Sequence, residues 1–186
     1  LLDSVQLQTL TSAQVTALRS SNLAVLSSTQ IGVLTSNQVA ALSSVQVTGL
    51  LTSQIAVLST GVLAVFSPAQ VSALGVAQVR ALSTAQFAVL GSAQIAALTS
   101  TQVAALGSAV ISSLRTAAVA ALEPGDLAVL STAQVVSLNT GQVRVLSTAQ
   151  IAAFTTLQVP ALTTAQVIAL STAQVVAIET RDIPCL

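Results

Sequence analysis

The sequence predicts an all-α solenoid in which every eight-residue repeat forms one short, capped helix. Twenty-three such octads follow one another from Leu2 without an insertion or deletion, and an aliphatic or Phe residue opens each of them. Residues that favour the start of a helix recur at fixed positions in the octad. A unit this short cannot bury an apolar face alone, so consecutive units must stack. We therefore expect residues 1–186 to form a single continuous array, as a fragment or subunit of a longer one.

The first half of the octad carries the signals for a helix start. Position 1 is Leu except at Phe66, Phe154 and Ile178. Position 2 is Ser, Thr, Asp, Asn or Gly in 18 octads, and these are the preferred N-cap residues of helices. Position 5 is Gln in 17 octads, which completes a capping box with position 2. Two of the three octads without Ser or Thr at position 3 have Pro68 or Pro124 there, as suits the first helical residue.

The second half of the octad supplies the apolar side of the helix. Position 6 is Val, Ile, Leu or Phe in all 23 octads, three residues before the next opening residue. A helix of about six or seven residues fits this pattern, and it is too short to be stable without neighbours. Pro160 and Pro184 occupy position 7, where a helix needs a backbone N–H. Those two octads are predicted to form a single turn followed by an extended piece.

A slower rhythm runs through the octads and predicts how many make one coil. The residues at position 6 that are larger than Val cluster in two adjacent octads of every four, which indicates a coil of about four octads, or 32 residues. A β-solenoid is the alternative fold, because Val, Ile and Thr favour strands. The recurring capping box and the many Ala residues favour helices. The large residues that follow the rhythm are Leu23, Ile31, Ile55, Leu63, Phe87, Ile95, Leu127, Ile151 and Ile183.

Composition excludes several classes of function. Five Arg and five acidic residues give a net charge of zero, so no nucleic-acid partner is expected. Polar residues interrupt nearly every octad, so no apolar run reaches the roughly 18 residues of a membrane span. The chain has no His, Trp, Tyr or Met, which removes most general bases and metal ligands. We expect no enzymatic activity, no cofactor, and no catalytic or metal-binding residues.

A few charged or reactive residues depart from the repeat. Glu123–Asp126 and Glu179–Asp182 place carboxylates at positions 2 and 5, where they can cap a helix start. A weak Ca²⁺ site is the alternative, although one octad supplies too few oxygen atoms for it. Arg80 and Arg144 are expected on the surface. Cys185 is expected to be a small core residue, with a redox or cross-linking role as the alternative.

The phrase Leu-Ser-Thr-Ala-Gln-Val at residues 130–135 and 170–175 resembles octad arrays in very long secreted or surface proteins of bacteria. Such proteins are often described as adhesin-, haemagglutinin- or haem-utilisation-like. The resemblance implies an extracellular stalk or fibre, exported by a one-step secretion route. The haem description has no support in this chain, because Cys185 is its only obvious axial ligand. Residues 170–178 also resemble the first helix of DNA-reading repeats of plant-pathogen effectors, but the base-reading loop and basic surface are absent.

Two functions follow as predictions. The first is a structural extracellular repeat protein that forms a rod, stalk or self-assembling filament, with copies joined end to end. The second is a surface- or glycan-binding adhesin module that uses a regular face of Thr and Gln side chains. Both place the protein outside the cell or on its surface.

Overall fold

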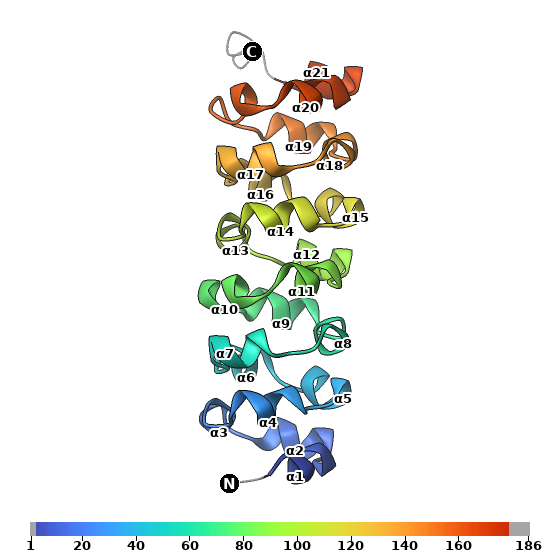
Figure 1. Ribbon diagram of the computed structural model, residues 1–186. Helices are drawn as coiled ribbons and strands as arrows, with labels where there is room; N and C mark the ends of the chain where they lie inside the picture. Colours follow the sequence, from blue (N-terminus) through green and yellow to red (C-terminus); the bar gives the residue numbers. More distant parts are fainter. Residues whose placement is uncertain (1–2, 179–186) are drawn as a thin grey trace. The chain divides into compact units, whose positions relative to one another are not determined.

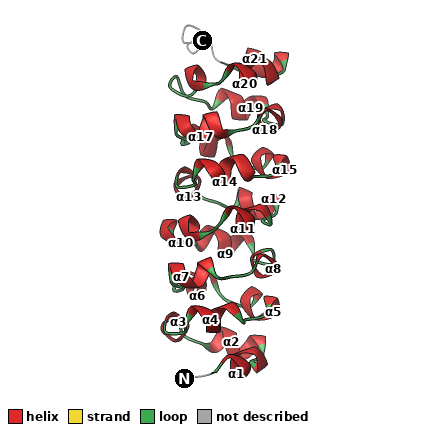
Figure 2. Cartoon of the chain, in the orientation of Figure 1, coloured by secondary structure: helices red, strands yellow, loops and turns green. Residues whose placement is uncertain are grey.

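The computed structural model describes residues 3–178, and these residues form short helices joined by short loops (Figures 1 and 2). No strand occurs within this range, so the all-α solenoid is confirmed and the β-solenoid is not. The chain divides into two compact units, Leu1–Ala97 with α1–α12 and Leu98–Leu186 with α13–α21. The helices are α1 Ser4–Thr9, α2 Ser12–Ala17, α3 Ser20–Ala24, α4 Ser28–Gly32, α5 Ser36–Ala40, α6 Ser44–Thr48, α7 Thr52–Ala56, α8 Thr60–Leu63, α9 Pro68–Ala73, α10 Val76–Ala81, α11 Thr84–Ala88, α12 Ser92–Ala96, α13 Ser100–Ala104, α14 Ser108–Ser113, α15 Thr116–Ala120, α16 Pro124–Ala128, α17 Thr132–Ser137, α18 Thr140–Arg144, α19 Thr148–Ala152, the 3-10 helix η1 Val159–Ala161, α20 Thr164–Ala169 and α21 Thr172–Ala177.

The helices begin where the capping residues predict. In α13, Thr99 is the N-cap, and its hydroxyl oxygen accepts the backbone N–H of Gln102 at 3.3 Å. The Gln102 side chain returns the contact by accepting the Thr99 N–H at 2.7 Å. Pro68 and Pro124 are the first residues of α9 and α16, as expected. The described α-helices have four to six residues, most of them five, and are therefore slightly shorter than the six or seven predicted.

The core of each unit consists of positions 6 and 1 of the octad. Position 6 is almost inaccessible to solvent except at Val167 and Val175, with Ile55 in unit 1 and Leu127 in unit 2 both 0% exposed. Position 1 residues such as Leu58 and Leu130 are 4% exposed and separate consecutive helices. Full burial of an aliphatic side chain contributes about 1.5–3 kcal/mol. Burial of two such residues per octad offsets the unfavourable free energy of forming a helix too short to be stable alone.

The coil is shorter than the 32 residues predicted. Helices that pack together within a unit belong to octads three apart, such as α4 with α7 and α16 with α19 (Figure 1). Side-chain hydrogen bonds between octads join residues 25 to 31 apart. Each helix lies beside the helix three octads earlier, while its N-terminus reaches the end of the helix four octads earlier. One coil therefore takes more than three and fewer than four octads. The four-octad pattern of large residues at position 6 does not match the number of octads in a coil.

The octad that contains Pro160 forms a turn in place of an α-helix, which confirms part of the prediction. Residues 156–158 form a turn that leads into η1, and no α-helix forms there. The preceding capping contacts survive, since the Thr155 N–H still donates to the Gln158 side chain at 2.8 Å. Proline disrupts the body of the helix and leaves its start intact. The corresponding prediction for Pro184 lies outside the described residues.

Gly49 lies where two stacked octads approach closely, and the Gly49→Ala substitution is expected to destabilise unit 1. A Cβ at residue 49 would lie 2.7 Å from the Cβ of Ser20, whose hydroxyl donates to the Val45 carbonyl at 3.1 Å. Overpacking of this kind costs about 1–3 kcal/mol. Gly125→Ala is the matched control, because a Cβ there meets nothing within 4 Å and Ala favours the helix. Thermal unfolding should show a lower melting temperature for Gly49→Ala and an unchanged or higher one for Gly125→Ala. An equal decrease in the two variants would contradict the close contact.

Candidate functional site

From Gln38 onwards, the glutamine at position 5 is buried in both units. Gln54 in unit 1 is 1% exposed and Gln142 in unit 2 is 0% exposed, although glutamine is a polar residue. Burial of an amide is costly unless its donors and acceptors are paired. The sequence accounts for one of these pairings, in which the Oε1 of Gln142 accepts the backbone N–H of Asn139 at 2.8 Å.

The amide nitrogen of the same side chain makes the contact that the sequence did not reveal. Gln54 Nε2 donates to the carbonyls of Leu23 and Leu26 at 2.8 and 2.7 Å. Gln142 Nε2 does the same to Ile111 and Leu114, both at 2.8 Å. In each case the two carbonyls belong to position 6 of the octad four earlier and to the opening Leu that follows it. We call this set the glutamine ladder: Gln38, Gln46, Gln54, Gln70, Gln78, Gln86 and Gln94 in unit 1, and Gln134, Gln142, Gln150, Gln158, Gln166 and Gln174 in unit 2.

The ladder solves a problem that very short helices share. The first four N–H groups and the last four carbonyls of any helix lack partners within it, and these helices consist of little else. The glutamine pairs with one N–H at its own helix start and with two carbonyls at another helix end. Ser at position 3 adds a further link, as when the Ser28 hydroxyl donates to the Ser53 carbonyl at 3.3 Å. One side chain thus joins its own octad to two consecutive earlier octads through backbone groups alone, independently of neighbouring side-chain identity.

The predicted face of Thr and Gln side chains does not form as expected. The glutamines of the ladder point inwards and are 0–6% exposed, so they are not available to a glycan or an ordered surface. Serine and threonine do reach the surface, but many hydroxyls bind the backbone as caps, as Ser131 does to the Gln134 N–H at 3.2 Å. The sequence correctly predicted the capping role and wrongly predicted that glutamine would be displayed.

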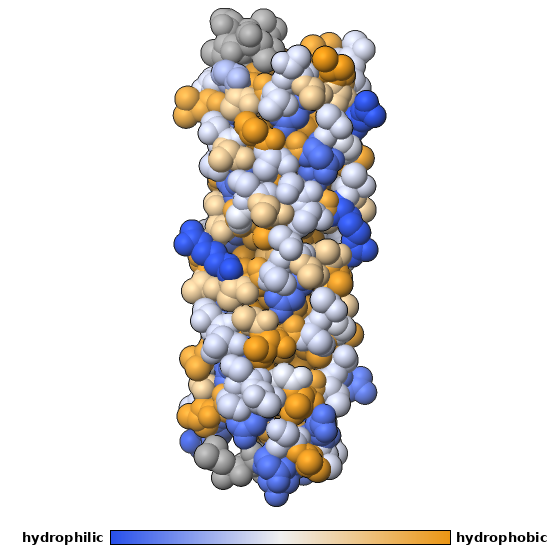
Figure 3. All heavy atoms as spheres, in the orientation of Figure 1, coloured by the Kyte–Doolittle hydropathy of each residue, from blue (hydrophilic) through white to orange (hydrophobic). Residues whose placement is uncertain are grey.

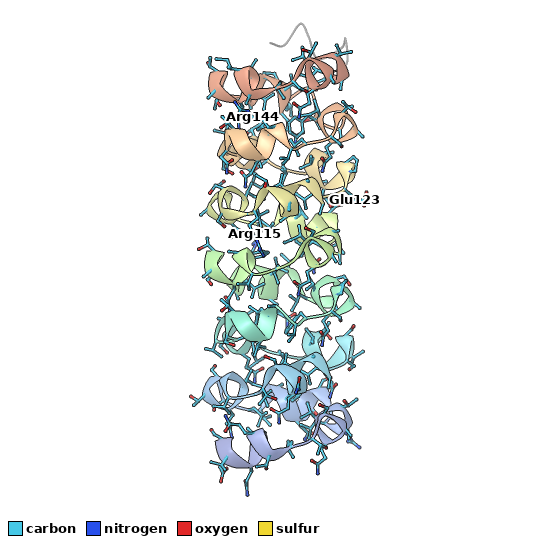
Figure 4. The ribbon with its side chains drawn as sticks, turned by 90° about the vertical axis from the view of Figure 1, so that its right-hand side faces the viewer. Arg115, Glu123 and Arg144 are labelled. Atoms are coloured by element: carbon cyan, nitrogen blue, oxygen red, sulfur yellow. The ribbon has the colours of Figure 1, made fainter. Side chains whose placement is uncertain are left out.

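The acidic cluster at Glu123–Asp126 acts as a cap. One carboxylate oxygen of the buried Asp126 accepts the Glu123 N–H at 3.1 Å, and the other accepts the Ser100 hydroxyl at 2.8 Å. Glu123 is exposed and projects from the start of α16 (Figure 4). Within residues 3–178, no group of three His, Cys, Asp or Glu residues could hold a metal ion. The second acidic cluster, Glu179–Asp182, and Cys185 lie outside the described residues.

The remaining charged residues are dispersed. Arg80, Arg115 and Arg144 are exposed, as predicted for Arg80 and Arg144. Figure 4 shows Arg115 and Arg144 at separate places on unit 2. Figure 3 shows weakly polar and apolar atoms interspersed with few strongly hydrophilic groups on one face. Among the described helices, none has the length and apolar character needed to cross a membrane.

Several exposed apolar side chains lie near the C-terminal end of the described residues. Leu157, Ile168 and Val176 are 76–78% exposed. Val167 and Val175, at the normally buried position 6, are 37% and 48% exposed. A hollow of about 300 Å³ lies beside them and is lined by Pro160, Leu162, Thr164, Val167 and Ile168.

A repeated short helix whose buried amide pairs with another coil defines an α-solenoid repeat protein. The particular family is the ALTTAQ repeat, which matches residues 12–44, 49–84, 71–108 and 119–156. These matches cover more than half of the chain, and the protein belongs to this family. The six residues Ala-Leu-Thr-Thr-Ala-Gln also occur literally at residues 161–166. No curated protein matches the chain.

Proposed function

We propose that this chain is a structural repeat protein whose octads stack into a stalk, rod or filament outside the cell. The glutamine ladder is the observation that carries the proposal. The same hydrogen bonds recur in unit 1 at Gln54 and in unit 2 at Gln142, with the same spacing to their carbonyl partners. A contact that repeats in this way can extend an array by any number of octads.

The contacts of each octad also favour an extendable structural element. Within each unit, helices pack on helices three octads away, and the ladder glutamines donate to carbonyls 28 and 31 residues earlier. Solenoids of this kind depend on nearest-neighbour contacts, so their stability grows with each added repeat. The buried glutamine side chains of the ladder are used for this stacking.

The proposed extracellular location has a separate support, the resemblance of residues 130–135 and 170–175 to arrays in secreted and surface proteins of bacteria. It is tested on intact cells of the source organism with an antibody against the chain. Labelling of intact cells, and its loss after external protease treatment, is the expected result. Labelling only after permeabilisation would overturn the proposed location and leave the proposed assembly untouched.

Assembly is tested by electron microscopy of the purified chain across a concentration series. We expect fibres with a regular axial repeat, longer and more numerous as the concentration rises, because association depends on concentration. Far-ultraviolet circular dichroism of the same samples should keep its helical signature. Particles of the size of a single chain at every concentration would overturn the proposal that the protein assembles by itself.

A further inference from the structure

The glutamine ladder has one gap inside unit 1. From residue 38 to residue 94, position 5 is glutamine in every octad except that of α8, where it is Val62. Val62 is 6% exposed, so it occupies the buried place of a ladder glutamine but has no amide to donate. The ladder spacing of 31 and 28 residues leads from Val62 to the carbonyls of Ile31 and Leu34. Ile31 accepts the Leu34 N–H at 3.2 Å, whereas no protein group within residues 3–178 donates to the carbonyl of Leu34, a residue 5% exposed.

The octads on either side of the gap make the contact that α8 lacks. Gln54 and Gln70 each donate to the carbonyl of the equivalent opening Leu at 2.7 Å. The coil that follows α8 also makes it, because Gln94 Nε2 donates to the Leu63 carbonyl at 3.0 Å. The helix α8 is therefore joined by the ladder to the coil after it and not to the coil before it.

The helix α8 is also weak in itself. It has four residues and is the shortest α-helix in residues 3–178. Its N-cap Ser59 accepts the Val62 N–H at 3.3 Å, but within the same residues no side chain returns the contact by accepting the Ser59 N–H. Gly61 lies within the helix, where glycine is less favourable than alanine. Apolar packing holds α8 in place, since Val62 and Leu63 are 6% and 0% exposed.

Burial of the Leu34 carbonyl without a donor is unfavourable, and separation of α8 from the preceding coil gives that carbonyl to water. In α7 and α9 the same separation breaks the two hydrogen bonds of a ladder glutamine, so it costs more. We infer that α8 is a built-in opening point of unit 1, which separates from the preceding coil more readily than α7 and α9 do. The opening is a property of the single chain. Its consequence rests on the proposed function: a stalk or filament under tension lengthens at α8 before it does so at α7 or α9.

The test is hydrogen exchange of the full chain and of a Val62→Gln variant, followed by mass spectrometry. In the wild type, peptides that cover α8 should exchange about tenfold faster or more than those that cover α7 and α9, because a detached helix of this length does not stay folded. The Val62→Gln substitution supplies a donor to the Leu34 carbonyl and an acceptor to the Ser59 N–H. It should slow the exchange of α8 by about tenfold or more, since two hydrogen bonds to such groups are worth about one decade.

Val45→Gln is the matched control, because it makes the same exchange in α6 at a side chain that is 71% exposed, and it should leave the exchange of α8 unchanged. Gln70→Val is the reverse test and removes the donor to the Val39 and Leu42 carbonyls, so α9 should then exchange as fast as α8 does in the wild type. Wild-type protection of α8 equal to that of α7 and α9 overturns the inference, as does unchanged exchange of α8 in Val62→Gln. Neither result bears on the proposed assembly, which electron microscopy tests separately.

Discussion

The Leu98→Asp substitution is expected to destabilise the protein by at least about 4 kcal/mol, because it places an unpaired charge in the packed row of position 1 residues. Leu98 is 5% exposed, and its octad supplies no cation to pair with a carboxylate. Chemical denaturation monitored by circular dichroism measures the change. We expect the helical signal of the variant to be lost at a much lower denaturant concentration than that of the wild type.

Thr99→Asp is the control for this prediction, since it introduces the same residue one position later. Thr99 caps α13 through its hydroxyl, and aspartate caps a helix at least as well as threonine. Its effect should stay within about 0.5 kcal/mol. Comparable losses in the two variants would refute the assignment of position 1 to the core and position 2 to the cap.

The Gln142→Met substitution is expected to cost about 2–4 kcal/mol, although it exchanges one buried side chain for another of similar length. It leaves the buried Leu114 carbonyl without its donor, which costs about 1–3 kcal/mol, and it removes the capping acceptor of the part-buried Asn139 N–H, which costs about 1 kcal/mol. The Ile111 carbonyl keeps its backbone bond from the Leu114 N–H at 3.2 Å, which limits the loss. Hydrogen exchange should show weaker protection of α14 and α18 than in the wild type.

Gln14→Met tests whether the loss comes from the ladder or from the cap. Gln14 makes the same capping contact to the Thr11 N–H, but it is exposed and its Nε2 has no partner among residues 3–178. Water can replace the single contact, so we expect a loss of about 1 kcal/mol or less. If Gln14→Met costs as much as Gln142→Met, the amide donors to the earlier coil contribute nothing to stability.

The local structure of each octad could be predicted from the sequence because its determinants lie within a few residues. The capping pair of Thr99 and Gln102 spans one helical turn, and proline at residues 68 and 124 marks the first helical position. The prediction for Pro160 held in part for the same reason, since proline acts on its own turn. Helix length was overestimated slightly, because in five-residue helices such as α13 the residue before the next Leu, here Ala105, lies outside the helix and turns the chain.

The contacts between octads could not be predicted, because they depend on how far the chain travels before it returns. The size rhythm at residues such as Ile55 and Phe87 indicated four octads, whereas helices three octads apart pack together. The sequence predicted that the glutamines cap the helices and face the surface, whereas the tertiary structure buries them. Carbonyls 28 and 31 residues earlier become neighbours only after the coil has closed.

The sequence by itself therefore determined an all-helical array of capped octads, with positions 1 and 6 in the core. These features follow from local hydrogen bonding and from the spacing of apolar residues along a helix. The tertiary structure alone decided the length of the coil and the second partner of every ladder glutamine. Both depend on distances between residues that are remote in sequence, and in Gln54 and Gln142 those distances convert a capping residue into the link between coils.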